Sequence, residues 1–225
     1  MENPWKTIRA ITKKEYIADC DKEAIGKLPP NRVRNLQFNY LPQPYMGDPE
    51  QAEIFLLNGN PNAPDTNELG ELSQKKFNED YKEYILCSLE NRVKDYPLYA
   101  LNPIFKRYSI HKWWYGHLRL LIELRGVETV SKKLFAAEYF PYFSDNFNDI
   151  INIPTLESQK HTFSLIEKAM KAEKMVVIMR AKRRWYSSVH GLEKYKRLIV
   201  LNSPTNPCLT PKNMNMKPED FDRIL

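Results

Sequence analysis

The chain has 225 residues, of which 42% are hydrophobic and 28% are charged, with a net charge of +6; this balance is typical of a globular protein that can bury a sizeable core. It has no apolar leader and no window approaching the roughly 18 apolar residues of a membrane helix, so we expect no membrane partner. Its three cysteines are scattered and form no CxxC pair, which favours a reducing cytoplasm. We also expect a monomer. Because nucleotide-binding glycine loops, GxSxG and HExxH are also missing, we expect no metal and no cofactor.

Residues 1–50 are interrupted by prolines and are expected to form an irregular N-terminal cover within a single domain spanning 1–225. Four short apolar runs follow, each ended by turn residues, and we interpret them as strands. The expected strands are 52–58, 133–140, 174–180 and 197–202. The segments between them are predicted to be helical, at 68–94, 111–124, 157–173 and 185–195, with a last helical turn within 216–225. Gly126 is expected to end the second of these helices.

Short apolar strands that alternate with helices indicate an α/β fold, here a small four-stranded parallel sheet with helices on both faces. In such sheets ligands bind beyond the carboxyl ends of the strands. Those ends fall at 58–62, 140–144, 180–185 and 202–206, where amides, aromatic residues and basic residues accumulate.

Three of these strand ends carry motifs in a recognisable order: Gly59-Asn60-Pro61, "FAAEYFPYF" at 135–143, and "SPTNP" at 203–207, with the proline-rich "PQPYMGDP" at 42–49 before them. In this order the chain resembles the uracil-DNA glycosylase superfamily, and is most similar to its single-strand-selective monofunctional branch, over roughly residues 42 to 213. The resemblance implies a DNA partner and hydrolysis of the N-glycosidic bond of a base flipped out of the stack.

The resemblance implies that Asn60 is catalytic and orients the attacking water. Gly59 and Pro61 would shape the turn, and Asn62 would line the base pocket with them. The alternative is an ordinary surface turn, because Asn, Gly and Pro are the residues that turns use.

Glu138 stands where the resemblance implies a base-reading asparagine. An ionised carboxylate only accepts hydrogen bonds, which suits a base with an exocyclic amine better than uracil. In a dry pocket Glu138 would instead be protonated and donate. A structural ion pair with a nearby cation is the third alternative.

The last loop lacks the histidine that stabilises the leaving base in that branch, since Leu201 occupies its position. Asn202 is the remaining candidate for a catalytic donor, and loss of such a donor typically slows a reaction about 100- to 1000-fold. The rest of the loop is expected to contact DNA unless it is a plain surface turn. Its candidate contacts are Ser203, Pro204, Thr205 and Asn206.

Between Lys171 and Val200 the chain has nine basic and two acidic residues. This density of positive charge is typical of a phosphate-binding surface, although a solvated basic face has the same composition. The candidate DNA contacts are Arg180, Lys182, Arg183 and Arg184. Tyr142 and Phe143 would either stack on an extruded base or belong to the core.

We therefore expect a DNA glycosylase-like protein with altered base specificity or reduced activity, in which Asn60, Glu138 and Asn202 meet in one pocket. The alternative is a non-catalytic nucleic-acid-binding module on the same fold. A third possibility is an unrelated α/β protein that binds a small nucleotide or a protein partner.

Overall fold

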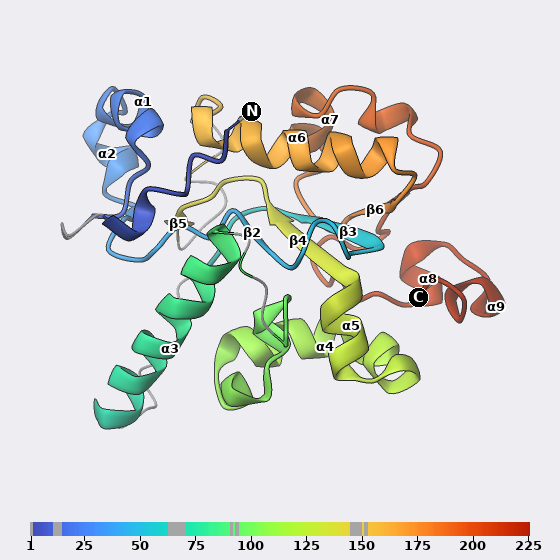
Figure 1. Ribbon diagram of the computed structural model, residues 1–225. Coiled ribbons are helices and arrows are strands. Elements are labelled where there is room, and N and C mark those ends of the chain that lie inside the picture. The colour runs from blue at the N-terminus through green and yellow to red at the C-terminus, as the bar shows by residue number, and fades with distance from the viewer. Residues whose placement is uncertain are drawn as a thin grey trace.

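The computed structural model describes residues 2–10, 15–62, 71–90, 92, 95–144, 150 and 153–225. Its centre is a five-stranded sheet in the order β2-β4-β3-β6-β7 (Figure 1). The strands are β2 (Tyr45–Met46), β3 (Ile54–Asn58), β4 (Leu134–Glu138), β6 (Met175–Ile178) and β7 (Leu198–Val200). The fold is therefore α/β, as predicted.

The sheet is mixed, so the predicted four-stranded parallel sheet is wrong in one respect. The four predicted strands β3, β4, β6 and β7 are parallel to one another, but β2 adds an antiparallel edge along β4. Gly47, directly after β2, has a φ of 109°, and a Cβ there would lie 2.5 Å from the Leu134 carbonyl oxygen. The absence of a side chain at Gly47 thus permits the close approach of β2 to β4.

Helices cover both faces of the sheet, which explains why every residue of β3 and β4 is buried. One face carries α6 (Glu157–Lys171) and α7 (Lys182–Ser188), and the other carries α3 (Glu71–Leu89), α4 (Ser109–Arg125) and α5 (Val127–Lys133) (Figure 1). As predicted, α4 turns Trp114, Leu118 and Leu121 toward the core and ends at Gly126. The ends of the predicted helix 68–94 lie partly outside the described residues.

The N-terminal cover has more structure than predicted. It contains α1 (Lys22–Gly26), α2 (Pro30–Val33) and β1 (Leu36–Gln37), which pairs with β5 (Phe143–Ser144) in a second, two-stranded sheet. Buried Asp21 fastens this cover to the body: it accepts hydrogen bonds from the Tyr142 hydroxyl at 2.7 Å and from the Ser158 backbone N–H at 3.0 Å.

The C-terminal part also differs from the prediction. Residues 185–195 do not form one helix, because α7 ends at Ser188 and a separate 3₁₀ turn, η6 (Leu192–Lys194), follows Gly191. The chain closes with α8 (Pro211–Met214) and α9 (Pro218–Phe221). Among the described residues no helix is both long and apolar enough to cross a bilayer.

Candidate functional site

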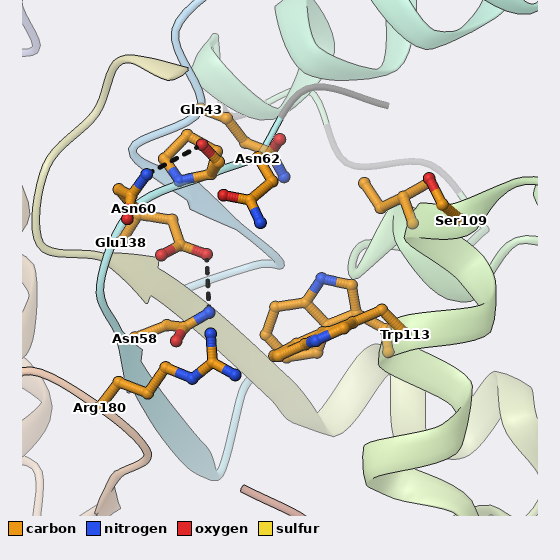
Figure 2. A pocket seen from close by; sticks show the side chains of 11 residues that line it. Gln43, Asn58, Asn60, Asn62, Ser109, Trp113, Glu138 and Arg180 are labelled. Atoms are coloured by element: carbon orange, nitrogen blue, oxygen red, sulfur yellow. Dashed lines mark hydrogen bonds between the residues drawn. The ribbon is translucent and has the colours of Figure 1, made fainter. Parts of the chain in front are cut away.

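A cavity of about 240 Å³ lies at the carboxyl ends of β3 and β4 (Figure 2). Its lining comes from the loop before β2, the end and following loop of β3, the last residue of β4, the first half of α4, and one residue of the loop after β6. These residues are Gln43, Asn58, Asn60, Pro61, Asn62, Ser109, Ile110, Trp113, Trp114, Glu138 and Arg180. The cavity therefore sits at the sheet edge where α/β proteins bind ligands.

Asn58 and Glu138 form a buried polar pair at the base of the cavity. They are register partners on adjacent strands, and the Asn58 Nδ2 donates to Glu138 Oε1 at 3.1 Å. The amide oxygen of Asn58, Oδ1, and the second carboxyl oxygen of Glu138, Oε2, are both buried without a hydrogen-bond partner among the described residues. Polar atoms in this state are rare in folded proteins and mark a place where a ligand or water is expected to bind.

Burial raises the pKa of Glu138 from its ordinary 4.5 to about 8, although the Asn58 amide and the Arg180 charge act in the opposite direction. No ion pair within the described part of the chain includes Glu138. Of the three interpretations of this residue, the protonated acid that donates a hydrogen bond fits these surroundings best.

Asn60 is held by its amide nitrogen. Its Nδ2 donates to the Ser144 carbonyl oxygen at 3.1 Å, the Ser144 Oγ at 3.0 Å and the Pro61 carbonyl oxygen at 3.2 Å. Because all three bonds use the nitrogen, the Oδ1 of Asn60 is the atom left to accept a hydrogen bond from a water or ligand. Ser144, which the sequence analysis did not single out, thus fixes the orientation of the candidate catalytic amide.

Two further hydrogen bonds fix the loop that carries these residues. The Phe140 backbone N–H donates to the Gly59 carbonyl oxygen at 2.9 Å. The indole of Trp185, fully buried on α7, donates to the Asn58 carbonyl oxygen at 2.8 Å. The end of β3 is therefore anchored from both neighbouring elements rather than left as a free turn.

The opposite wall of the cavity is aromatic. Trp113 on α4 faces the Asn58–Glu138 pair across the cavity (Figure 2). The Arg180 guanidinium lies 5.5 Å from the centre of the Trp113 ring, a cation–π distance, and its Nε donates to the Pro204 carbonyl oxygen at 3.1 Å. At the top, Gln43 Oε1 accepts from the Tyr81 hydroxyl at 2.8 Å. A planar ligand would lie between a polar floor and an indole.

A second, larger hollow of about 780 Å³ lies at the carboxyl ends of β6 and β7; we call it the basic groove. Arg180 lines both the cavity and this groove, so the two spaces share a wall. The basic groove is lined by Ile178, Met179, Arg180, Ala181, Lys182, Arg183, Arg184, Val200, Leu201, Asn202 and Pro204. Lys182 and Arg183 are exposed, and among the described residues none of the four groove cations is in an ion pair.

The structure brings together only some of the predicted site residues. Asn60, Pro61, Asn62, Glu138 and Arg180 line the cavity, and Gly59 is buried within the same loop. Arg180, Lys182, Arg183, Arg184, Asn202 and Pro204 line the basic groove. The two sets share one residue, Arg180.

Asn202 does not join Asn60 and Glu138, so the expected convergence of three residues is wrong for Asn202. Its side chain is exposed and its Nδ2 donates to the Lys212 carbonyl oxygen at 3.0 Å, while Leu201 is buried. The hydroxyls of Ser203 and Thr205 lie 3.3 Å apart, and the Asn206 N–H donates to Ser203 Oγ at 3.4 Å. This loop borders the basic groove and not the cavity.

Tyr142 and Phe143 lie in the core, as the alternative for them expected. Both side chains are fully buried and neither lines the cavity. The Tyr142 hydroxyl is bonded to Asp21, and the Phe143 ring packs 5.4 Å from Tyr40. The aromatic residue positioned to stack on a ligand is instead Trp113, which the sequence analysis did not single out.

No protein-family model, no curated protein and no solved structure matches this chain. Its function therefore has to be inferred from the chemistry of the cavity and the basic groove.

Proposed function

We propose that the protein is a DNA glycosylase-like hydrolase of the uracil-DNA glycosylase type. In this proposal the basic groove binds the DNA backbone, and one extruded base enters the cavity, where its N-glycosidic bond is hydrolysed. The observation that carries the proposal is the shared wall: a cavity with a buried polar pair opens directly beside a cationic groove, with Arg180 lining both. Phosphate contacts and base recognition have to be adjacent in this way, because base and backbone belong to one nucleotide.

The chemistry assigns a role to each side chain. The Asn60 Oδ1 holds a water, whose oxygen bonds to the sugar C1′ as the bond from C1′ to the base nitrogen breaks. The base leaves with the bonding electron pair, and the sugar passes through an oxocarbenium-like state. The water oxygen loses one proton to solvent as it becomes the C1′ hydroxyl, and the departing base anion takes up one proton from solvent, so the step balances. Arg180 lines the cavity and stabilises the negative charge on the departing base, a task that the apolar side chain at Leu201 cannot perform.

A second candidate function, a non-catalytic nucleic-acid-binding module, is favoured by the end of β7. Leu201 is buried and Asn202 is bonded away from the cavity, so this strand offers no donor to a leaving base. Binding by the basic groove needs none of the cavity residues other than Arg180, which lines both spaces.

Base release from single-stranded oligonucleotides separates the two functions. Oligonucleotides that carry uracil or another modified base would be incubated with the protein and treated with alkali, which cleaves at abasic sites. We expect cleavage with the wild-type protein and a loss of about 100-fold or more in Asn60→Ala, because an oriented water is lost. The exposed Asn39, outside both spaces, supplies the control Asn39→Ala.

Oligonucleotide retention without abasic product from any base would favour the binding module. If the protein retains no nucleic acid at all, both functions are excluded.

A further inference from the structure

The Asn58–Glu138 pair, whose side chains line the cavity, contains two buried oxygens without a hydrogen-bond partner among the described residues, Asn58 Oδ1 and Glu138 Oε2. The pair is held together by the 3.1 Å hydrogen bond, and both residues line the cavity. A buried oxygen without a partner lowers stability, and a bound ligand that supplies partners relieves this cost. The pattern of donors and acceptors on these atoms therefore decides which ligand edge fits.

The pattern depends on the proton of Glu138. When the acid is neutral, the pair presents one donor and one acceptor, whichever way the Asn58 amide is turned: either the amide donates and the acid O–H stays free, or the acid O–H donates and the amide N–H stays free. When the acid is ionised it can only accept, the Asn58 N–H remains bound to it, and the pair presents two acceptors.

We propose, on the basis of the proposed function, that Asn58 and Glu138 act together as the specificity-determining pair, and that the proton on Glu138 selects the ligand edge. The neutral pair takes a lactam edge, in which a ring N–H stands beside a carbonyl. The ionised pair takes an edge with two neighbouring N–H donors, such as an amidine or the ring N–H and amino group of a guanine-type base. In this proposal Asn58 contributes to ligand recognition, which could not be predicted from its position at the end of an apolar strand.

The groups around Glu138 allow this switch to operate near neutral pH. Burial raises its pKa to about 8, and the charge of Arg180, after β6, lowers it. Tyr81 on α3 and Tyr99 in the 3₁₀ turn η3 (Tyr99–Leu101) also lie near Glu138. Burial raises the pKa of each hydroxyl above its ordinary value of 10, so both tyrosines stay neutral near pH 7. Asn58, from β3, does not titrate.

Two small planar probes test the switch: 2-pyridone, a lactam, and benzamidine, an amidinium with two neighbouring N–H donors. Neither probe titrates between about pH 6 and about pH 9, and calorimetry would measure the binding of each to the whole protein. From about pH 6 to about pH 9 we expect the affinity for 2-pyridone to fall about tenfold, because the protonated fraction of Glu138 falls by about that factor around a pKa of about 8. Over the same range we expect the affinity for benzamidine to rise up to about a hundredfold, because the ionised fraction rises from about 1% to about 90%. We call these opposite changes in the two affinities the crossover. Affinities that do not change in opposite directions with pH, or no binding of either probe, would overturn the proposal.

Glu138→Gln holds the pair in its neutral pattern at every pH. In this variant we expect pH-independent binding of 2-pyridone and weak binding of benzamidine throughout, whereas the matched control Glu123→Gln, an exposed position on α4, keeps the crossover. Asn58→Ala removes the partner and is expected to weaken both probes about tenfold. Circular dichroism would establish that each variant is folded, and a crossover that persists in folded Glu138→Gln would contradict the proposal.

The probes contain neither a phosphate nor a glycosidic bond, so this experiment is independent of catalysis. A crossover in a protein that releases no base from DNA supports the specificity pair and rejects the proposed hydrolysis. Base release without a crossover rejects the pair and leaves the hydrolysis standing.

Discussion

At the scale of single residues, Glu138 makes stability depend on pH. Its pKa is about 8 in the folded protein against an ordinary 4.5, so the folded state keeps a proton that the unfolded state loses. The contribution is fully present below about pH 4.5 and is lost as the pH rises through about 8. We expect the free energy of unfolding of the wild type, relative to Glu138→Gln, to fall by a few kcal/mol over this range in urea titrations. A constant difference across the range would contradict the burial of a neutral acid.

His161 on α6 has the opposite dependence. Both ring nitrogens are buried without partners among the described residues, and burial, assisted by Lys168, lowers its pKa from 6.5 to about 4. Between about pH 6.5 and about pH 4, His161 is protonated in the unfolded state but neutral in the folded state. Stability is therefore lost as the pH falls through this range. His161→Phe, which keeps a ring beside Tyr45, is expected to lessen this acid sensitivity in the same titrations. If the free energy of unfolding of His161→Phe fell with decreasing pH as steeply as that of the wild type, His161 would not be the responsible group.

The sequence could identify some of these residues but not others. Glu138 stood out because a carboxylate among apolar strand residues is costly. Tyr142 and Phe143 could not be assigned, because a buried aromatic residue and a stacking one have the same local pattern. The sequence predicted Asn58 only as the last residue of a strand. Its contact with Glu138 becomes visible only in the register between β3 and β4.

At the scale of elements, the short strand β2 depends on Gly47. A methyl group there would strike the Leu134 carbonyl oxygen, and the positive φ would be strained. Gly47→Ala is therefore expected to cost roughly 2 kcal/mol or more in free energy of unfolding. The matched control is Gly116→Ala, in the exposed middle of α4 with open space around it, which is expected to stabilise by about 1 kcal/mol. Equal effects at the two positions would contradict the close packing of β2.

The sequence predicts the elements that have a long apolar run or several turns of helical periodicity. The cores of the four parallel strands are apolar runs, and α4 and α6 follow the helical period. The two-residue β2 is too short to carry any period, and it exists because β4 provides an edge to pair with. Likewise α5 follows α4 after a single glycine, a reversal that depends on the φ of 79° at Gly126.

At the scale of the whole molecule, the proposed function predicts a specific salt dependence. Binding of single-stranded oligonucleotides should weaken with salt, and each phosphate contact contributes about 0.7 to the slope of log affinity against log salt concentration. Arg183→Ala, which removes an exposed groove cation, is expected to reduce the slope by about this amount. Arg119→Ala, an exposed position on α4 outside the basic groove, is the control and should leave it unchanged. Equal slopes for Arg183→Ala and the wild type would remove the basic groove from the binding surface.

The short helix α7 joins the two halves of the site. Three of its residues, Lys182, Arg183 and Arg184, line the basic groove, and the indole of Trp185 in the same helix holds the carbonyl oxygen of Asn58. One turn of helix therefore sets the spacing between these cations and the Asn58–Glu138 pair. Under the proposed function this spacing has to match the distance from a base to its own phosphate, so we expect a base joined to the backbone by a longer or shorter connection to bind more weakly.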